Sequence, residues 1–216
     1  RVGLIREMVR YGVIKSGANA YYSGGSSRTT VAAKLTLTML RKASRNIQAN
    51  HAKRITSILA PTPNISSKYV EAAYLVFCHT DVEQDVRDIA GFTPIAAYGS
   101  RKPMHDQEIG SVENFRFSPE LNPYINAGVA VGATGLYSTG GSNVDVYPVI
   151  VCGEEAWGQV ALRGSDSLDP TWIPPGEKTK SDPHGQRGFV GAKFYMNCVI
   201  LNDGWMAIIE AGITAL

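Results

Sequence analysis

The chain has 216 residues, enough for one domain of ordinary size or two small lobes with a substantial core. Its 21 basic and 19 acidic side chains give a formal net charge of +2, too small and too mixed for a nucleic-acid stripe or a polybasic membrane patch. Charged residues make up 19% of the chain, below the roughly 25% usual in soluble domains, which favours a protein with large interfaces.

The cysteines and the apolar runs exclude several further classes. Cys78, Cys152 and Cys198 lie far apart in apolar runs, so we expect a reducing compartment and neither a disulfide framework nor a zinc site. Every apolar run is shorter than the roughly 18 to 20 residues of a membrane span, and a signal-peptide pattern is absent from the start of the sequence. We therefore expect a soluble protein. Residues 1–15 have a helical pattern and are expected to be the end of a longer helix.

The first third of the chain predicts a connection followed by a helix. Glycine and serine at residues 23–27 favour a flexible link. After it, Leu37, Leu40 and Ile47 recur at helical spacing, and Thr36 is placed to cap the helix with its hydroxyl. The helix is expected to end near Asn50.

The next unit is a strand joined directly to a short helix. Residues 73–78 form a continuous apolar run, typical of a strand buried on both faces. Thr80 and Glu83 then have the spacing of a capping box, in which each side chain accepts from the other residue's amide. The box predicts a short helix from Asp81 to about Ile89.

The second half of the chain alternates strands with long irregular segments. Residues 109–117 alternate apolar and polar side chains and predict one strand with a wet face, and residues 147–152 predict a second buried strand. Residues 122–143 are rich in small side chains and residues 163–187 in proline, so both are expected to be loops.

The end of the chain predicts a long two-stranded ribbon. Residues 189–201 and 205–213 are strand-like and flank the dipeptide Asp203-Gly204, which tolerates the backbone angles of a tight hairpin.

Candidate catalytic groups are few, and each has a structural alternative. His79 and Asp81 could act as a base with an orienting carboxylate, but Asp81 also suits the first turn of a helix. The four histidines lack the spacing of metal ligands, and residues 128–135 depart from a phosphate-binding glycine loop. Glu154 and Glu155 are expected to be solvated. We expect no catalytic residue, metal or cofactor.

Basic side chains gather between residues 41 and 54. Arg41, Lys42 and Arg45 give the predicted helix a basic face, which suits a solvated surface, a contact with a neighbouring subunit or, less well, nucleic acid.

Three motifs together resemble the major capsid protein family of N4-like tailed phages, whose subunits have the Hong Kong 97 (HK97) fold. Residues 77–87 (FCHTDVEQDVR) resemble the family's HPDVExDxR segment, with Thr80 in place of proline. Residues 108–117 (EIGSVENFRF) are similar to its EIGxVExxRF strand, and residues 182–193 (DPHGQRGFVGAK) to its DPLxQRGxxGWK segment, with Ala192 in place of tryptophan.

The resemblance implies an α+β, HK97-like fold with an axial and a peripheral domain. Residues 1–30 would hold the end of the spine helix in the peripheral domain, and residues 31–186 the axial domain with long interface loops. Residues 187–216 would return as strands of the peripheral domain. The N-terminal arm and the extended loop of the family are expected to be missing from this chain.

The resemblance further implies a structural protein of the virion that is assembled in the host bacterial cytoplasm. Copies would associate head to tail into pentamers and hexamers of an icosahedral head enclosing double-stranded DNA. Scaffold, portal and possibly decoration proteins are the expected partners, with weak nonspecific contacts to packaged DNA and no membrane contact. Candidate intersubunit contacts are Arg41, Lys42, Arg45, Asp182 and Arg187, while Thr80 and Glu83 form a structural motif.

Two alternatives remain open. An encapsulin-like compartment shares this fold and would enclose protein cargo. A small α/β enzyme with a His79/Asp81 site would show a deep polar pocket beside residues 78–87.

Overall fold

The computed structural model describes residues 19–57, 69–99, 102–119, 123–132, 134–160, 168–178, 180–194 and 197–215. The contacts divide the chain into two units. The first contains the described residues up to Ala156 and from Ile200 onward, and the second runs from Trp157 to Val199. The helix predicted over residues 1–15 lies outside the described residues.

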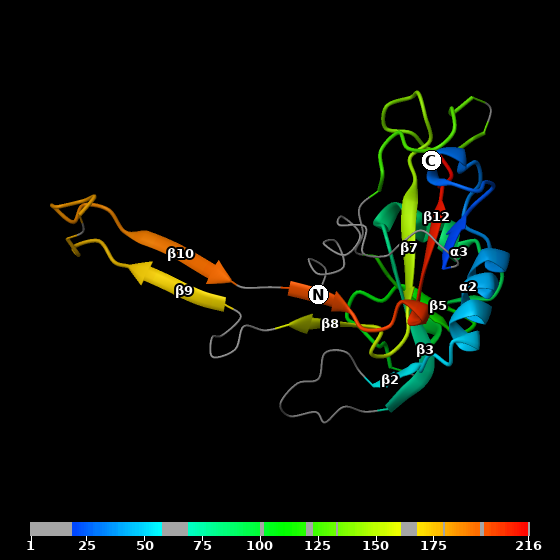
Figure 1. Cartoon of the computed structure of the whole chain (residues 1–216), viewed down its shortest axis with the longest axis horizontal. Helices are drawn as coiled ribbons and strands as arrows, with labels where there is room; N and C mark the ends of the chain where they lie inside the picture. Colours follow the sequence, from blue (N-terminus) through cyan, green and yellow to red (C-terminus); the bar gives the residue numbers. More distant parts are fainter. Residues whose placement is uncertain are drawn as a thin grey trace. The chain divides into compact units, whose positions relative to one another are not determined.

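The first unit is built on a mixed sheet with the strand order β1-β12-β7-β3-β6-β5-β4, in which β2 also pairs with β3 (Figure 1). β12 pairs antiparallel with β7 and parallel with β1, while β3 pairs antiparallel with β7 and parallel with β6. The strands are β1 (Ala20–Tyr22), β2 (Ile55–Ser57), β3 (Tyr69–Cys78), β4 (Phe92–Pro94), β5 (Gly110–Val112), β6 (Phe115–Pro119), β7 (Tyr147–Cys152) and β12 (Met206–Ala211).

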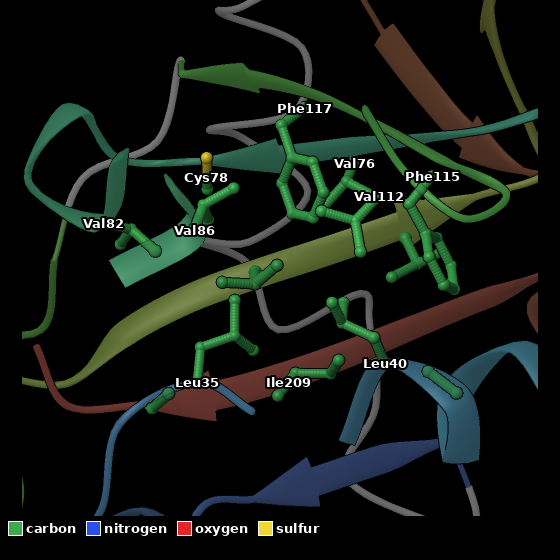
Figure 2. Close-up of a cluster of buried hydrophobic side chains, with 14 of the residues drawn as sticks. Leu35, Leu40, Val76, Cys78, Val82, Val86, Val112, Phe115, Phe117 and Ile209 are labelled. Atoms are coloured by element: carbon green, nitrogen blue, oxygen red, sulfur yellow. The ribbon is translucent and has the colours of Figure 1, made fainter. Parts of the chain in front are cut away.

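Two α-helices, α2 (Leu37–Ala49) and α3 (Glu83–Arg87), contribute to one buried cluster on a face of this sheet. Leu40 of α2, Val86 of α3 and Ile209 of β12 are among its members (Figure 2). The alternate residues of the central strands, such as Phe77 and Ile150, are buried as well. The predicted helix after Thr36 and the two buried strands are therefore confirmed, although the Thr36 side chain makes no capping hydrogen bond.

Short 3-10 turns connect these elements: η1 (Arg28–Thr30), η2 (Thr80–Val82), η3 (Ile95–Ala97) and η4 (Asp203–Trp205). The segment at residues 23–27, predicted to be a flexible link, is held in place by hydrogen bonds. The Ser23 hydroxyl donates to the Lys34 carbonyl at 2.6 Å, and the Ser27 amide donates to the Thr30 hydroxyl at 2.9 Å.

The single strand predicted over residues 109–117 is wrong, because this segment folds into the hairpin of β5 and β6. Glu113 has a φ of 50° and begins the turn, and Val112 faces Phe115 across it. A two-residue turn shifts the alternation of buried residues by one position, so the polar pair Glu113-Asn114 between Val112 and Phe115 is the signal that distinguishes this hairpin from a continuous strand.

The second unit contains β8 (Trp157–Val160), β9 (Leu168–Ile173), β10 (Phe189–Phe194) and most of β11 (Asn197–Ile200). β9 pairs antiparallel with β10, and β8 pairs with β11. The prediction that residues 163–187 hold no regular element is therefore wrong. Pro170 is tolerated inside β9 because each strand of a two-stranded ribbon has a free edge.

The predicted hairpin between residues 189–201 and 205–213 is also wrong. β12 lies between β1 and β7 of the first unit, while β10 and β11 pair with β9 and β8. The residues at the expected hairpin form η4 instead, where the Asn202 side chain accepts from the Gly204 amide at 3.0 Å. The Trp205 indole donates to the Asn50 carbonyl at 2.9 Å, which joins this turn to the end of α2.

Among the described residues, no helix combines the length and apolar character that crossing a membrane requires.

Candidate functional site

The His79/Asp81 pair has the contacts of a structural cap. The Asp81 amide donates to Nδ1 of His79 at 3.2 Å, and the same nitrogen lies 3.2 Å from Oδ2 of Asp81. The bond from the backbone amide makes the His79 ring the cap at the start of η2. The Tyr147 hydroxyl donates to Asp81 Oδ2 at 3.1 Å, and burial together with this bond raises the pKa of Tyr147.

The predicted capping box of Thr80 and Glu83 is wrong. His79, and not Thr80, supplies the side-chain acceptor at the start of η2. The Glu83 carboxylate accepts from Nε of Arg87 at 2.9 Å, one turn further along α3. The 3-10 turn that precedes α3 moves the capping position back by one residue.

The sequence motif at residues 108–117 is explained by a buried ion pair. Glu108 accepts from Nη1 of Arg116 at 3.2 Å and from the Tyr98 hydroxyl at 2.5 Å, and its second oxygen accepts from the Met104 amide at 2.6 Å. Burial and the bond to Glu108 raise the pKa of Tyr98 to about 12. Gly110 is required because a Cβ there would lie 2.4 Å from the Phe92 ring. The motif therefore fixes the hairpin onto its neighbours.

Asp85, in the motif at residues 77–87, joins three segments. It is buried and accepts from the Thr214 amide at 2.9 Å, the Thr214 hydroxyl at 2.7 Å and Nζ of Lys34 at 3.3 Å. Cys78 in the same motif is buried, which raises the pKa of its thiol to about 12. The sequence identified this motif, but residue spacing alone did not indicate that Asp85 is the residue that joins these segments.

A second buried carboxylate holds the segment before α2 against β12. Glu210 accepts from Nε and Nη2 of Arg28 at 2.9 and 2.6 Å. The Arg28 guanidinium also lies 3.8 Å from the centre of the Tyr124 ring. Sequence analysis missed this pair because its members are 182 positions apart.

The three candidate contacts on α2 differ in their partners. Arg41 donates to Glu113 through Nε at 2.9 Å, so this side chain bridges α2 and the β5-β6 turn within one chain. Lys42 and Arg45 are exposed, and within the described part of the chain neither pairs with a carboxylate. Lys42 borders a cavity of about 580 Å³ beside β1.

The β9-β10 ribbon, defined as residues 168–194, exposes three large apolar side chains. Trp172 is 73% exposed, and Val190, its partner across the ribbon, is 78% exposed. Phe189 beside them is 61% exposed. A soluble chain rarely leaves such side chains together in water, so the ribbon is the strongest candidate for a contact surface.

The other two candidate contacts lie in the turn between β9 and β10. The Asp182 carboxylate accepts from the Arg187 amide at 2.8 Å, which holds the turn together. Asp182 is half-buried and Arg187 is exposed.

Two cavities of the described residues lie away from the His79/Asp81 pair. The cavity beside β1 and a second one of about 180 Å³ near Asp85 and Asp88 include neither His79 nor Asp81 in their linings. Across the described parts of the chain, no group of three or more histidine, cysteine or acidic side chains is arranged to hold a metal ion.

Comparisons with known proteins find similarity to phage capsid proteins. No known protein-family model matches the chain. The chain is 21% identical to the major capsid protein of Pseudomonas phage KPP21, over 96% of this chain and 56% of that protein. Its fold matches the solved capsid of Ralstonia phage GP4 with a TM-score of 0.59 and 14% identity, over 93% of this chain and 54% of that one.

The chain therefore spans little more than half the length of either phage protein. The predicted resemblance to phage major capsid proteins is confirmed, while the N4-like subfamily stays a prediction. The predicted α+β fold of the HK97 type is confirmed as well: this chain has the fold of a phage capsid subunit.

Proposed function

We propose that this chain acts as a major capsid protein that self-associates into the icosahedral head of a tailed phage. Subunits would meet head to tail in pentamers and hexamers, and the closed shell would enclose double-stranded DNA. The role is structural and needs no catalysis or cofactor. Its sequence relative is named as a major capsid protein, and its structural relative is a phage capsid.

The observation that carries this proposal is the apolar surface of the β9-β10 ribbon. An isolated two-stranded ribbon is marginally stable in water, and exposed Trp172, Phe189 and Val190 add an unfavourable hydrated surface. At the observed exposures these three side chains present about 400 Å² of apolar area. One side of a standard protein interface covers about 800 Å², so this patch would supply the core of one contact.

Several finer assignments belong to the same proposal. Residues 1–30 and 187–216 would belong to the peripheral domain and residues 31–186 to the axial domain. Arg41, Lys42, Arg45, Asp182 and Arg187 are the charged candidates at subunit contacts. Arg41 would act there while keeping its bond to Glu113.

The partners follow from the same role. Scaffold and portal proteins would guide assembly in the host bacterial cytoplasm, and a decoration protein is a further candidate. Packaged DNA would touch the inner surface only through weak nonspecific contacts, because the net charge of +2 is small.

The test is electron microscopy of the purified full-length protein, with light scattering to give the particle mass. We expect wild type to form closed shells or rings of five or six subunits. The double variant Trp172→Ser/Val190→Ser is expected to remain monomeric because it loses the apolar patch. Ile125→Ser is the matched control, since Ile125 is 59% exposed in the first unit.

Two results would contradict the proposed function, and a third would contradict the role of the ribbon. A wild-type protein that stays monomeric with scaffold and portal supplied would favour the alternative of a small enzyme with a His79/Asp81 site. Shells that take up a protein cargo and exclude DNA would support the encapsulin-like alternative. Normal shells from the double variant would show that the ribbon is not part of the contact between subunits.

A further inference from the structure

The small net charge of the chain is the sum of two oppositely charged parts. Residues 1–70, the basic part, contain 12 basic and 1 acidic side chains, whereas residues 71–216, the acidic part, contain 9 basic and 18 acidic ones. Their formal charges are therefore +11 and −9. A strongly basic segment inside a nearly neutral chain indicates a surface that attracts a polyanion.

The acidic part neutralises only some of the cations of the basic part. The described residues 19–57 contain seven basic and no acidic side chains. Three of the seven pair with carboxylates of the acidic part: Arg28 with Glu210, Lys34 with Asp85 and Arg41 with Glu113. Within the described residues, the other four form no ion pair: Lys42, Arg45, Lys53 and Arg54.

Two of these unpaired cations lie on the outer face of α2. Leu40, Ala43 and Ile47 bury the inner face of the helix, whereas Lys42 and Arg45 are exposed. The two cations are three positions apart, a spacing at which like charges repel, and α2 contains no acidic residue that would relieve them. The chain therefore keeps an unfavourable pair of charges that a bound anion would neutralise.

A hollow beside this face offers hydroxyl groups and no carboxylate. The cavity of about 580 Å³ has Lys42 in its lining, together with two tyrosines and two serines: Tyr21, Tyr22, Ser26 and Ser27. None of the described residues that line it is acidic. An anion bound at Lys42 therefore meets no opposing charge on this side of the helix.

Duplex DNA fits this face better than a second copy of the chain does. A subunit contact through these cations needs a matching acidic patch, but the carboxylates that reach the basic part already pair with it. Other exposed carboxylates are spread over separate segments, such as Asp88, Asp106 and Asp203. DNA needs no such match, because it carries about one negative charge per 1.7 Å of its axis. It is also the polyanion that the proposed shell encloses.

We propose that the outer face of α2, with Lys42 and Arg45, binds the phosphates of double-stranded DNA and therefore faces the inside of the shell. This inference rests on the proposed shell function and names the surface that touches the packaged DNA. It assigns Lys42 and Arg45 to DNA in place of a subunit contact. Two cations in each copy bind weakly and without sequence preference, because phosphate contacts do not read the bases.

The first measurement is the binding of a short duplex to the unassembled full-length protein, followed by fluorescence anisotropy at several salt concentrations. Each phosphate contact contributes about 0.9 to the slope of log affinity against log salt concentration. Lys42→Gln/Arg45→Gln should therefore reduce that slope by about 1.8 and weaken binding at low salt by about tenfold or more. Two controls should bind like wild type: Lys42→Arg/Arg45→Lys keeps both charges, and Lys102→Gln removes an exposed charge of the acidic part.

Assembly then distinguishes DNA binding from a contact between copies. Lys42→Gln/Arg45→Gln should form particles at the same protein concentration as wild type, because it changes no contact between subunits. Duplex added to closed wild-type particles should bind no better than duplex added to closed particles of the variant, because the face is then inside.

The outcomes separate this inference from the function on which it rests. Wild type that never assembles contradicts the proposed function, while the salt slopes still decide whether α2 binds DNA. Wild type that assembles, together with an unchanged slope for Lys42→Gln/Arg45→Gln, overturns only this inference. A variant that fails to assemble although its DNA binding is unchanged shows that the face contacts a second copy. Closed wild-type particles that bind added duplex as strongly as the unassembled protein overturn the placement of the face inside the shell.

Discussion

The central sheet and the β9-β10 ribbon differ in how far their large side chains are buried within the chain. In the sheet, Phe117 is fully buried and Glu108 has three hydrogen-bond donors from its own chain. In the ribbon, Trp172 and Val190 face each other with more than seven-tenths of each residue exposed. The difference teaches that the sheet is stabilised by contacts within one chain, whereas the ribbon has the surface of an element completed by a partner.

The largest test of this comparison truncates one phenylalanine in each region. Phe117→Ala should lower the free energy of unfolding by about 3–5 kcal/mol, because it opens a cavity in a packed core. Phe189→Ala should stay within about 0.5 kcal/mol of wild type, because the Phe189 ring is mostly in water. Urea denaturation of the unassembled protein, followed by circular dichroism, measures both. Equal losses would show that the ribbon is packed within its own chain.

Breaking the buried ion pair is the next largest effect. Glu108→Ala should cost about 3 kcal/mol, since it removes the buried carboxylate that pairs with the Arg116 guanidinium and accepts from the Tyr98 hydroxyl. Glu71 is the matched control, because it approaches the same guanidinium at 4.0 Å from an exposed position. Glu71→Ala should cost less than about 1 kcal/mol in the same denaturation experiment. A small loss for Glu108→Ala would contradict the assignment of the motif.

The long loop at residues 122–143 provides a test by pH. Burial of Asp145 favours its neutral form, but hydrogen bonds from the Asn126 amide and from the amide and hydroxyl of Thr139 prevail and lower its pKa. A lowered folded pKa means that Asp145 stabilises the fold above its unfolded pKa of about 3.9. That stabilisation is lost as the pH falls through the folded value.

The measurement is the difference in urea midpoint between wild type and Asp145→Asn from about pH 6 to pH 2. The difference should be constant at the upper end and shrink below about pH 3.9. Asp106→Asn, at an exposed position of the first unit, is the control and should differ little from wild type throughout. A difference that already disappears near neutral pH would contradict the lowered pKa of Asp145.

The smallest effect distinguishes His79 from Thr80 as the cap of η2. Thr80→Ala should leave stability within about 0.5 kcal/mol of wild type, because its hydroxyl caps no amide of the turn. His79→Ala should cost about 1 kcal/mol, the usual value for a lost cap, plus its ring contact with Tyr147. Thermal unfolding measures the stability of both variants. A larger loss for Thr80→Ala than for His79→Ala would support the capping box instead.

The elements that the sequence predicted correctly are those whose signal is local. The buried strand at residues 147–152 follows from its continuous apolar run, and α2 follows from Leu40 and Ile47 at helical spacing. The resemblance to capsid proteins also came from short motifs. Glu108, Gly110 and Arg116 are spaced so that one hairpin brings them together with Phe92.

The errors concern strand pairing, which depends on contacts distant in sequence. Asp203-Gly204 suggested a hairpin, but β12 finds better burial between β1 and β7, with which it shares long-range contacts. The sequence did not predict β9, because Pro170 and Pro174 disfavour a strand when only neighbouring residues are considered. The Glu210–Arg28 pair could not be predicted, since nothing near either residue indicates a partner so far along the chain.

The most direct test of the central claim follows the environment of Trp172 while the full-length protein assembles. The emission of Trp172 is the difference between wild type and Trp172→Phe, measured with acrylamide quenching before and after particles form. Trp172 should be quenched freely in the monomer and become protected, with emission shifted to shorter wavelength, in the particles. Particles in which Trp172 stays as accessible as in the monomer would contradict the claim that the ribbon is completed by a second copy.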